Sequence, residues 1–135
     1  MDEGKLTLTV VTPERAVLDR IVCDEVTLPA EAGELGVLPG HTPLIALLGI
    51  GLVTYRDGGK KGSLAVRGGF VEIASDVVRI LADEAVAAAA VDAAAVTKQK
   101  DAAESRRQSV VGNEQLDAVN AEVAFAEARL KLVTA

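Results

Sequence analysis

The sequence predicts an α+β fold in which an N-terminal antiparallel β-sandwich precedes a C-terminal α-helical hairpin. Up to about Ala85, the chain holds all four prolines and eleven of the twelve glycines, and turn residues divide its apolar residues into short runs. This pattern is typical of an all-β domain, either a sandwich or a small barrel, and we favour the sandwich. From Ala85 onward no proline remains and alanine is the commonest residue, as expected for helices.

The strands are expected from local alternation and from the turns between apolar runs. Residues 6–10 (LTLTV) alternate strictly, which places Leu6, Leu8 and Val10 on one face. Two hairpins follow, and the pairs of segments that form them are 51–56 with 63–67 and 70–74 with 77–82. Their expected turns are the glycine-rich segment 57–62 and the dipeptide Ser75-Asp76.

The C-terminal segment should form two helices of about twenty residues each, divided at Gly112-Asn113, with Asn113 as the N-cap of the second. The apolar positions of the second helix are Leu116, Val119, Val123, Ala126, Leu130 and Val133, with Phe125 and Leu132 on an adjoining stripe. In the first helix, Val96, Ala103 and Val110 recur every seven residues along a seam that is mostly alanine.

Such a seam predicts shallow docking of the hairpin. Burying a methyl group recovers much less free energy than burying a leucine side chain. The helices, which have a high intrinsic helix propensity, are therefore expected to leave the sandwich at modest cost. A tail that stays permanently folded against the sandwich is the alternative.

Composition argues against several function classes. The net charge is −6 and only three residues are aromatic, which disfavours a nucleic-acid partner. One cysteine and one histidine cannot form an internal disulfide or a Cys/His zinc site, and a reducing compartment is expected. The uncharged segment 35–55 contains prolines and glycines that argue against a transmembrane helix, and the first five residues (MDEGK) lack the features of a secretory signal.

No catalytic arrangement is evident. His41 lies between Pro39 and Pro43 without a recognisable nucleophile, and Cys23 is expected to be a small buried residue. The glycine-rich segments do not have the spacing of a phosphate-binding loop. The residues alone therefore predict a non-catalytic interaction module without a cofactor.

Three segments carry a family resemblance. They are LTLTVVTPE at residues 6–14, EAGELGVLPGHTPL at 31–44, and GGFVEI at 68–73 followed by the apolar segment 77–85. In this order and spacing they resemble the epsilon subunit of bacterial F-type ATP synthases, which is called delta in mitochondria. The resemblance implies a sandwich of two five-stranded sheets in residues 1–85 and a mobile helical hairpin in residues 86–135.

The resemblance also implies a function. Members of this family have no catalytic site. They belong to the central stalk of the proton-translocating rotary motor, where the sandwich binds the gamma subunit and the ring of c subunits. Their C-terminal helices can extend to the alpha and beta subunits of the catalytic hexamer and oppose ATP hydrolysis. The implied location is the cytoplasmic side of the bacterial inner membrane, as a peripheral subunit without its own transmembrane segment.

The matching motif positions imply two sets of contact residues. The residues expected at the c-ring and the gamma foot are Glu31, Gly33, Glu34 and His41, with Thr12 and Ala46 nearer gamma. The residues expected to meet the catalytic hexamer from the extended hairpin are Arg106, Arg107, Arg129 and Lys131. Neutralisation of neighbouring acids such as Asp101, Glu104 and Glu127 is the alternative role for these four cations.

Nucleotide binding is the remaining question. Some members of this family bind ATP through a motif of the form Ile/Leu-Asp-x-x-Arg-Ala. Here the segment reads VDAAAV at residues 91–96, so that Asp92 is present but Ala95 occupies the arginine position. We therefore expect weak ATP binding or none, and Asp92 is better interpreted as a helix N-cap. An autonomous ATP-sensing module and an unrelated β-sandwich hydrolase remain as alternative functions.

Overall fold

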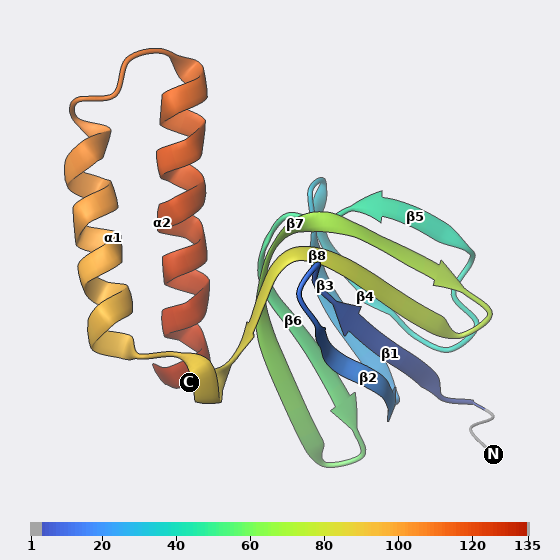
Figure 1. The fold of residues 1–135 in the computed structure, drawn as a ribbon. Helices are drawn as coiled ribbons and strands as arrows, with labels where there is room; N and C mark the ends of the chain where they lie inside the picture. The colour runs from blue at the N-terminus through green and yellow to red at the C-terminus, as the bar shows by residue number, and fades with distance from the viewer. Residues whose placement is uncertain (1–3, 135) are drawn as a thin grey trace.

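Two β-layers and a helical hairpin make up the computed structural model, which describes residues 4–134 (Figure 1). The strands are β1 (Leu6–Val11), β2 (Ala16–Cys23), β3 (Glu25–Ala30), β4 (Gly33–Val37), β5 (Leu44–Leu47), β6 (Ile50–Asp57), β7 (Lys60–Ala74) and β8 (Val77–Ala87). They are followed by a 3₁₀ turn, η1 (Ala88–Ala90), and by the helices α1 (Ala93–Arg107) and α2 (Asn113–Thr134). The predicted sandwich with a C-terminal helical hairpin is confirmed.

The long strands β7 and β8 belong to both layers. Near the β6–β7 turn, they pair with the neighbouring strands to form the sheet β4-β3-β6-β7-β8, which we call the hairpin-side sheet. Near the β7–β8 turn, they form the sheet β2-β1-β8-β7-β5, which we call the open sheet. Each layer thus has five strands, although the hydrogen bonds join all eight strands into one continuous sheet. The pairing is antiparallel as predicted except between β1 and β8, which run parallel.

Gly68 and Gly69 let β7 pass from one layer to the other. Their φ angles are +67° and +111°, a region that favours glycine. On one side of the pair Leu64 and Val66 face the core, whereas on the other side Val71 and Ile73 do. The alternation of inward positions therefore shifts by one residue at the two glycines while the pairing register with β8 continues unchanged, and both halves of the strand keep their apolar side chains inside.

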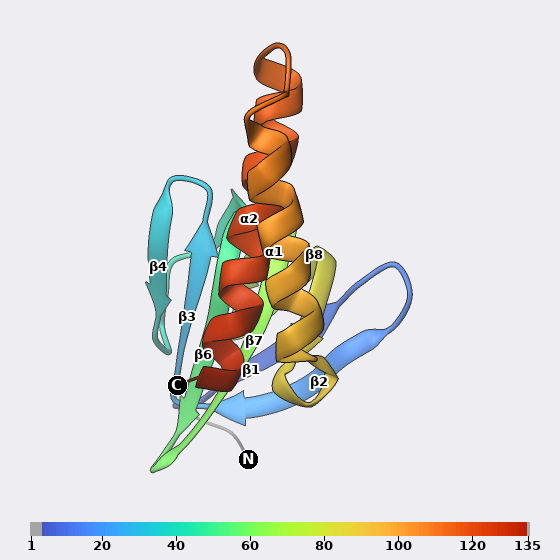
Figure 2. The ribbon, with the colours of Figure 1, turned by 90° about the vertical axis from the view of Figure 1, so that its left-hand side faces the viewer.

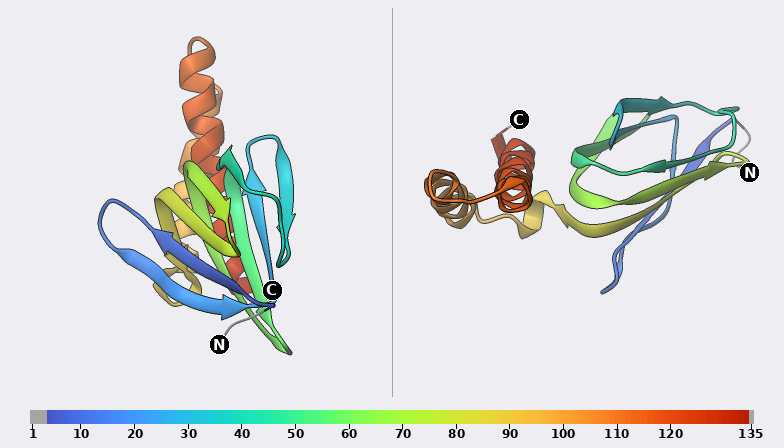
Figure 3. Two further views of the ribbon diagram at one scale, coloured as in Figure 1. Left: turned by 90° about the vertical axis from the view of Figure 1, so that its right-hand side faces the viewer. Right: turned by 90° about the horizontal axis from the view of Figure 1, so that it is seen from above.

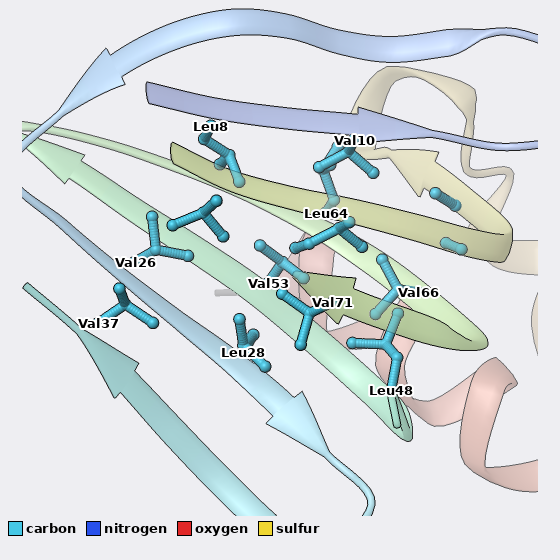
Figure 4. Close-up of a cluster of buried hydrophobic side chains, with 14 of the residues drawn as sticks. Leu8, Val10, Val26, Leu28, Val37, Leu48, Val53, Leu64, Val66 and Val71 are labelled. Carbon is cyan, nitrogen blue, oxygen red and sulfur yellow. The ribbon is translucent and has the colours of Figure 1, made fainter. Parts of the chain in front are cut away.

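The core between the layers is aliphatic (Figure 4). Leu6, Leu8 and Val10 are fully buried, which confirms their predicted inward face. Cys23 is also fully buried, as expected, and burial is the main cause that raises the pKa of its thiol. No polar or charged side chain is buried among the described residues, so the stability of the sandwich depends on apolar packing.

The two predicted hairpins are present, with one difference in length. Ser75 and Asp76 have φ angles of +52° and +62° and join β7 to β8 as a two-residue turn with positive φ at both positions, as predicted for a tight hairpin. The β6–β7 connection is shorter than the predicted segment 57–62, because Asp57 already pairs with Lys60. The pairing of β6 with β7 continues to Asp57 and Lys60, so only Gly58 and Gly59 remain in the turn.

The helices begin where capping groups are available. The side chain of Asp92 accepts a hydrogen bond from the backbone N–H of Ala95 at 3.2 Å, which confirms it as the N-cap of α1. The second helix begins one residue earlier than predicted, so that Asn113 is its first residue and not its N-cap. α2 begins at Asn113, and the carbonyl of Gly112 accepts the first helical bond, from Leu116 at 3.2 Å.

Helix α2 packs on β6 and β7, and α1 packs on α2 (Figures 1 and 2). Seen from above, α2 lies between α1 and the sandwich (Figure 3). One side of α2 buries Val119 and Val123 against Ala103 of α1. Another side buries Phe125 and Ala128 against Ala65 of β7.

The two predicted stripes of α2 therefore face different neighbours, because Val119 and Val123 of the first pack on α1 and Phe125 and Leu132 of the adjoining one pack on the sandwich. Val119, Val123 and Ala126 are buried as expected, but Leu116 and Val133 are 36% and 38% exposed. Leu116 lies near the end of the hairpin that projects past the sandwich (Figure 3). On the sandwich side, Phe125 is the one large side chain of α2 that is buried, with the half-buried Leu132 beside it.

Three charged side chains join the start of β1 to two turns. Lys5 Nζ lies 2.5 Å from Asp24 Oδ1 and 2.7 Å from Asp57 Oδ1, and Asp24 also accepts the backbone N–H of Gly58 at 2.7 Å. The ammonium group of Lys5 is the main cause that lowers the pKa of Asp24. The two carboxylates in turn raise the pKa of Lys5.

The lowered pKa of Asp24 predicts a loss of stability in acid. Since the unfolded chain binds a proton more readily at this group, its contribution to the free energy of unfolding is present above the ordinary aspartate pKa and is lost as the pH falls through the lowered folded value. Asp24→Asn should therefore be less stable than the wild type at neutral pH, and the difference should shrink on acidification. Urea unfolding at a series of pH values tests this, with Asp19→Asn at an exposed position of β2 as the control. A difference that does not depend on pH would contradict it.

Candidate functional site

A row of apolar side chains crosses the outer face of the open sheet. The pairing register places Leu47 of β5 opposite Phe70 of β7, Phe70 opposite Leu81 of β8, and Leu81 opposite Val11 of β1. Leu47 and Phe70 are 60% and 45% exposed, and Leu81 and Val11 are half-buried. We call Leu47, Phe70, Leu81 and Val11 the apolar row.

The row continues onto further exposed apolar side chains at its β5 end. Ile45, on the same face as Leu47, is 71% exposed, and Leu38 in the preceding loop is 57% exposed. β5 lies at the edge of the open sheet and pairs with β7 alone. Exposed apolar side chains on an edge strand indicate a surface that another chain covers.

The two sheets differ in what covers them. The outer face of the hairpin-side sheet presents Ala65, Leu52 and Val86, which form a cluster with Phe125 and Ala128 of α2. The apolar row belongs to the open sheet, whose edge strand β5 lies on the side of the sandwich away from the helices (Figure 1). The chain thus covers one apolar sheet face itself and leaves the other open.

The predicted gamma-side residues lie at the two ends of the apolar row. Thr12 follows Val11, and its hydroxyl accepts the backbone N–H groups of Glu14 and Arg15 at 3.3 Å, which shapes the β1–β2 turn. Ala46 precedes Leu47 on β5, but its own side chain is half-buried and packs against the core. The exposed neighbours of Ala46, rather than Ala46 itself, present the apolar surface.

The predicted carboxylates gather at the β3–β4 turn. Glu31, Gly33 and Glu34 are all exposed there, and Gly33 has a φ of +135°, which requires glycine at this turn. The backbone N–H of Glu31 donates to the carbonyl of Leu47 at 2.9 Å. The acidic turn therefore adjoins the Leu47 end of the apolar row.

His41 lies away from these carboxylates. It belongs to the loop between β4 and β5, where the backbone N–H of Gly40 donates to Asp76 Oδ1 at 2.7 Å and the His41 ring Nδ1 lies 2.6 Å from the carbonyl of Thr42. This loop adjoins the β7–β8 turn, at the start of β5, whereas Glu31 adjoins the end of β5. The structure therefore separates His41 from Glu31 and Glu34 by the length of that strand.

Two of the four predicted helix cations have partners within the hairpin. Arg106 forms an ion pair with Glu122, and Arg129 Nη1 donates to Gln99 Oε1 at 3.1 Å. The Arg129 guanidinium also lies 4.6 Å from the ring centroid of Phe125. Burial is the main cause that lowers the pKa of Arg129. The other two predicted cations, Arg107 and Lys131, are exposed.

A cleft beside the hairpin brings several of these groups together. Arg67, Glu84, Gln99, Arg106, Glu122 and Arg129 line it. Arg67 Nη1 lies 3.5 Å from Glu84, Arg106 pairs with Glu122, and Arg129 donates to Gln99. Because each guanidinium already faces a carboxylate or an amide, and Asp92 is engaged as an N-cap, the cleft has little free positive charge for a phosphate group.

The apolar row is the surface that sequence reasoning missed. Its signals were present, because Leu44–Leu47 (LIAL) is an apolar run that does not alternate and Phe70 directly follows Gly69. Within residues 4–134, neither helix has the length and hydropathy to cross a bilayer. The same part of the chain holds no cluster of metal-ligating side chains.

Comparisons with known proteins agree on one family. The sequence model described as "ATP synthase, Delta/Epsilon chain, beta-sandwich domain" matches residues 5–88. The chain is 44% identical over 131 residues to the ATP synthase epsilon chain of Solibacter usitatus, covering 96% of this chain and 95% of that one. It is 36% identical over 127 residues to that of Symbiobacterium thermophilum, covering 94% and 90%.

Solved structures give the same result. A chain in the cryo-EM structure of the Euglena gracilis mitochondrial ATP synthase, OSCP/F1/c-ring, has a TM-score of 0.81 and 25% identity, covering 95% of this chain and 80% of that one. A chain from the central stalk and c-ring of the Tetrahymena thermophila mitochondrial ATP synthase has a TM-score of 0.61 and 17% identity, covering 96% and 97%, and supports the fold alone. On these matches, the chain belongs to the ATP synthase delta/epsilon family.

Proposed function

We propose that this chain is a non-catalytic central-stalk subunit of a proton-translocating F-type ATP synthase, which connects the catalytic sector to the c-ring and regulates ATP hydrolysis through its C-terminal helices. The observation that carries the proposal is the apolar row, an uncovered sheet face in a chain whose relatives are ATP synthase epsilon chains. The subunit would lie on the cytoplasmic side of the bacterial inner membrane, as a peripheral component.

The sandwich supplies two adjoining surfaces of different chemistry. The apolar row, with Thr12 and Ala46 at its ends, is suited to a packed, largely permanent contact, which we assign to the gamma subunit. Glu31 and Glu34 are suited to polar or basic loops of the c-ring. Exposed ion pairs at such a rim contribute more to orientation than to affinity.

The hairpin supplies the regulatory element. In its contact with the hairpin-side sheet, Phe125 and Ala128 of α2 are buried against Ala65, and the half-buried Leu132, Ile50, Leu52 and Val86 pack around them, so release exposes one large, buried side chain and four half-buried ones. In an extended state, Arg107 and Lys131 would be available to acidic surfaces of the alpha and beta subunits, whereas Arg106 and Arg129 would first have to leave their present partners.

Deletion of the hairpin tests the regulatory part. A chain truncated after Ala87 keeps β8 complete, because β8 ends at that residue. In the reconstituted ATPase, this truncation should raise the rate of ATP hydrolysis several-fold while the sandwich stays bound. The full-length chain is the control, and circular dichroism checks that the truncated sandwich is folded. An unchanged hydrolysis rate with the truncated chain bound would contradict a regulatory role.

The ATP-sensing alternative predicts a different result. Since Ala95 replaces the motif arginine and the cations of the cleft are paired, equilibrium dialysis of the isolated chain against ATP should detect no binding in the micromolar range. Ala95→Arg, which restores the motif residue at an exposed position of α1, is the matched variant. A micromolar dissociation constant for the wild-type chain would support the alternative instead.

A further inference from the structure

One ion pair lies within the uncovered face of the open sheet. Glu72 of β7 and Arg79 of β8 are opposite each other in the antiparallel register, and Arg79 Nη1 lies 3.0 Å from Glu72 Oε1. Their chain neighbours Val71, Ile73 and Ile80 are buried in the core, so both charged side chains point outward. The side chains of Glu72 and Arg79 are 45% and 52% exposed. The pair therefore lies on the same surface as the apolar row.

Uncharged side chains surround the pair on this face. The apolar row crosses the same strands two residues away, and on the other side Ala74 of β7 pairs with Val77 of β8, which pairs with Thr7 of β1. Among the described outward-facing residues of β1, β5, 70–74 of β7 and 77–81 of β8, only Glu72 and Arg79 are charged. A standard protein–protein interface buries about 800 Å² on each partner, which extends well beyond one row. A chain that covers the apolar row therefore covers the pair as well.

The cross-strand neighbours of the pair cannot replace either of its members. In the same row, Glu72 lies next to Ile45 of β5, and Arg79 lies next to Thr9 of β1. Ile45 is apolar, and the Thr9 hydroxyl already accepts the backbone N–H of Arg20 at 3.2 Å. Over residues 4–134, neither charged side chain has a second ion-pair or hydrogen-bond partner. Each charge is thus balanced by the other alone.

Covering such a pair changes its energetics. In the free chain the pair contributes little to stability, because water screens both charges and can solvate either one when the other is removed. Under a partner, water no longer reaches the two groups. Removing one member then leaves an unpaired, desolvated charge, whereas removing both leaves none. Glu72 and Arg79 should therefore act almost independently in the free chain and as a unit in a complex.

We propose that Glu72 and Arg79 are specificity-determining residues of the gamma contact, in which gamma covers the pair intact and places uncharged groups opposite it. Since the pair has no net charge, a charged group of the partner would gain little attraction there and would lose its own hydration. The pair thus selects a partner surface without charge at this position. The inference rests on the proposed function, because that function assigns the open sheet to the gamma contact.

A double-mutant cycle on the binding affinity tests this. The full-length chain is titrated onto the gamma-containing catalytic sector from which the native chain has been removed. Glu72→Gln and Arg79→Gln should each weaken binding about 30-fold or more, whereas the double variant should bind within about threefold of the wild type. Urea unfolding of the free chains checks that the variants fold. It should show a coupling between the two positions of about fivefold or less in the unfolding equilibrium constant, because the pair is exposed there.

The same two strands carry a matched control pair. Arg67 of β7 and Glu84 of β8 also lie opposite each other, at 3.5 Å, but in the hairpin-side sheet. Arg67→Gln and Glu84→Gln, alone or together, should leave the affinity for the catalytic sector within about twofold of the wild-type value. Glu72→Arg with Arg79→Glu keeps the pair and reverses its direction. Because the facing surface carries no charge, this exchanged variant should bind within about tenfold of the wild type.

Two outcomes would overturn the proposal and leave the proposed function standing. If the losses of affinity in the two single variants add in the double variant, gamma supplies its own partner for each charge. If the single variants bind as tightly as the wild type, the pair stays in water outside the contact. In both cases the binding of the wild-type chain still supports the stalk function. A wild-type chain that does not bind the catalytic sector would instead contradict the proposed function itself, and the inference with it.

Discussion

Replacement of Gly69 by alanine should destabilise the sandwich by about 3 kcal/mol or more, enough to unfold much of the protein. A Cβ atom at this position would lie 1.9 Å from the carbonyl oxygen of Leu81 and 2.9 Å from Cα of Ala82. The φ of +111° adds strain for any residue with a side chain. Because β7 and β8 are paired on both sides of this point, neither backbone can move away.

The matched control is Gly36→Ala on β4. A Cβ atom there has no neighbour within 4 Å, and its φ lies outside the left-handed region. Its free energy of unfolding should stay within about 0.5 kcal/mol of the wild-type value. Urea unfolding followed by circular dichroism measures both variants. If Gly69→Ala proves as stable as Gly36→Ala, the bend does not have the role assigned to it.

Local patterns in the sequence were sufficient for most of the secondary structure. The alternation of Leu6, Leu8 and Val10 depends only on which face of one strand is buried, and Ser75-Asp76 is a turn between two apolar runs that are close in sequence. Asp92 caps a helix through a bond to a residue three positions away. Interactions of such short range can be inferred from composition and spacing.

The remaining features depend on pairing between distant segments. The parallel contact of β1 with β8 joins residues about seventy positions apart, and no local pattern distinguishes it from an antiparallel one. Likewise, β7 and β8 belong to both layers because the alternation of inward residues shifts at Gly68 and Gly69, which the burial pattern of the folded chain shows. The two apolar stripes of α2 were predicted, but which of them meets α1 and which meets the sandwich was not.

The same limit applies to the candidate site. Glu31 and His41 lie within one short motif, yet β4 and the following loop carry His41 toward the other end of β5. Conversely, Leu47, Phe70 and Val11 are far apart in sequence and come into one row through three strand pairings. Single exposed apolar residues are common on protein surfaces, so their alignment is what indicates a binding surface.

Placing charges in the apolar row should abolish its use as an interface. Leu47→Asp with Phe70→Asp puts two carboxylates into a contact that we expect to be apolar and desolvated. The affinity for the gamma subunit should fall by about 100-fold or more, equivalent to about 2.7 kcal/mol. Since Leu47 is 60% exposed and Phe70 45% exposed, the fold should be retained, which thermal unfolding checks. Lys61→Glu, on the half of β7 that belongs to the hairpin-side sheet, is the control and should bind normally.

Co-purification of the tagged, full-length chain with the rest of the synthase is the most direct test of the stalk function. The wild-type chain should bring down gamma and the c-ring, and the doubly charged variant, although folded, should bring down neither. Failure of the wild-type chain to bring down gamma, or equal recovery of gamma with the folded, doubly charged variant, would contradict the stalk function.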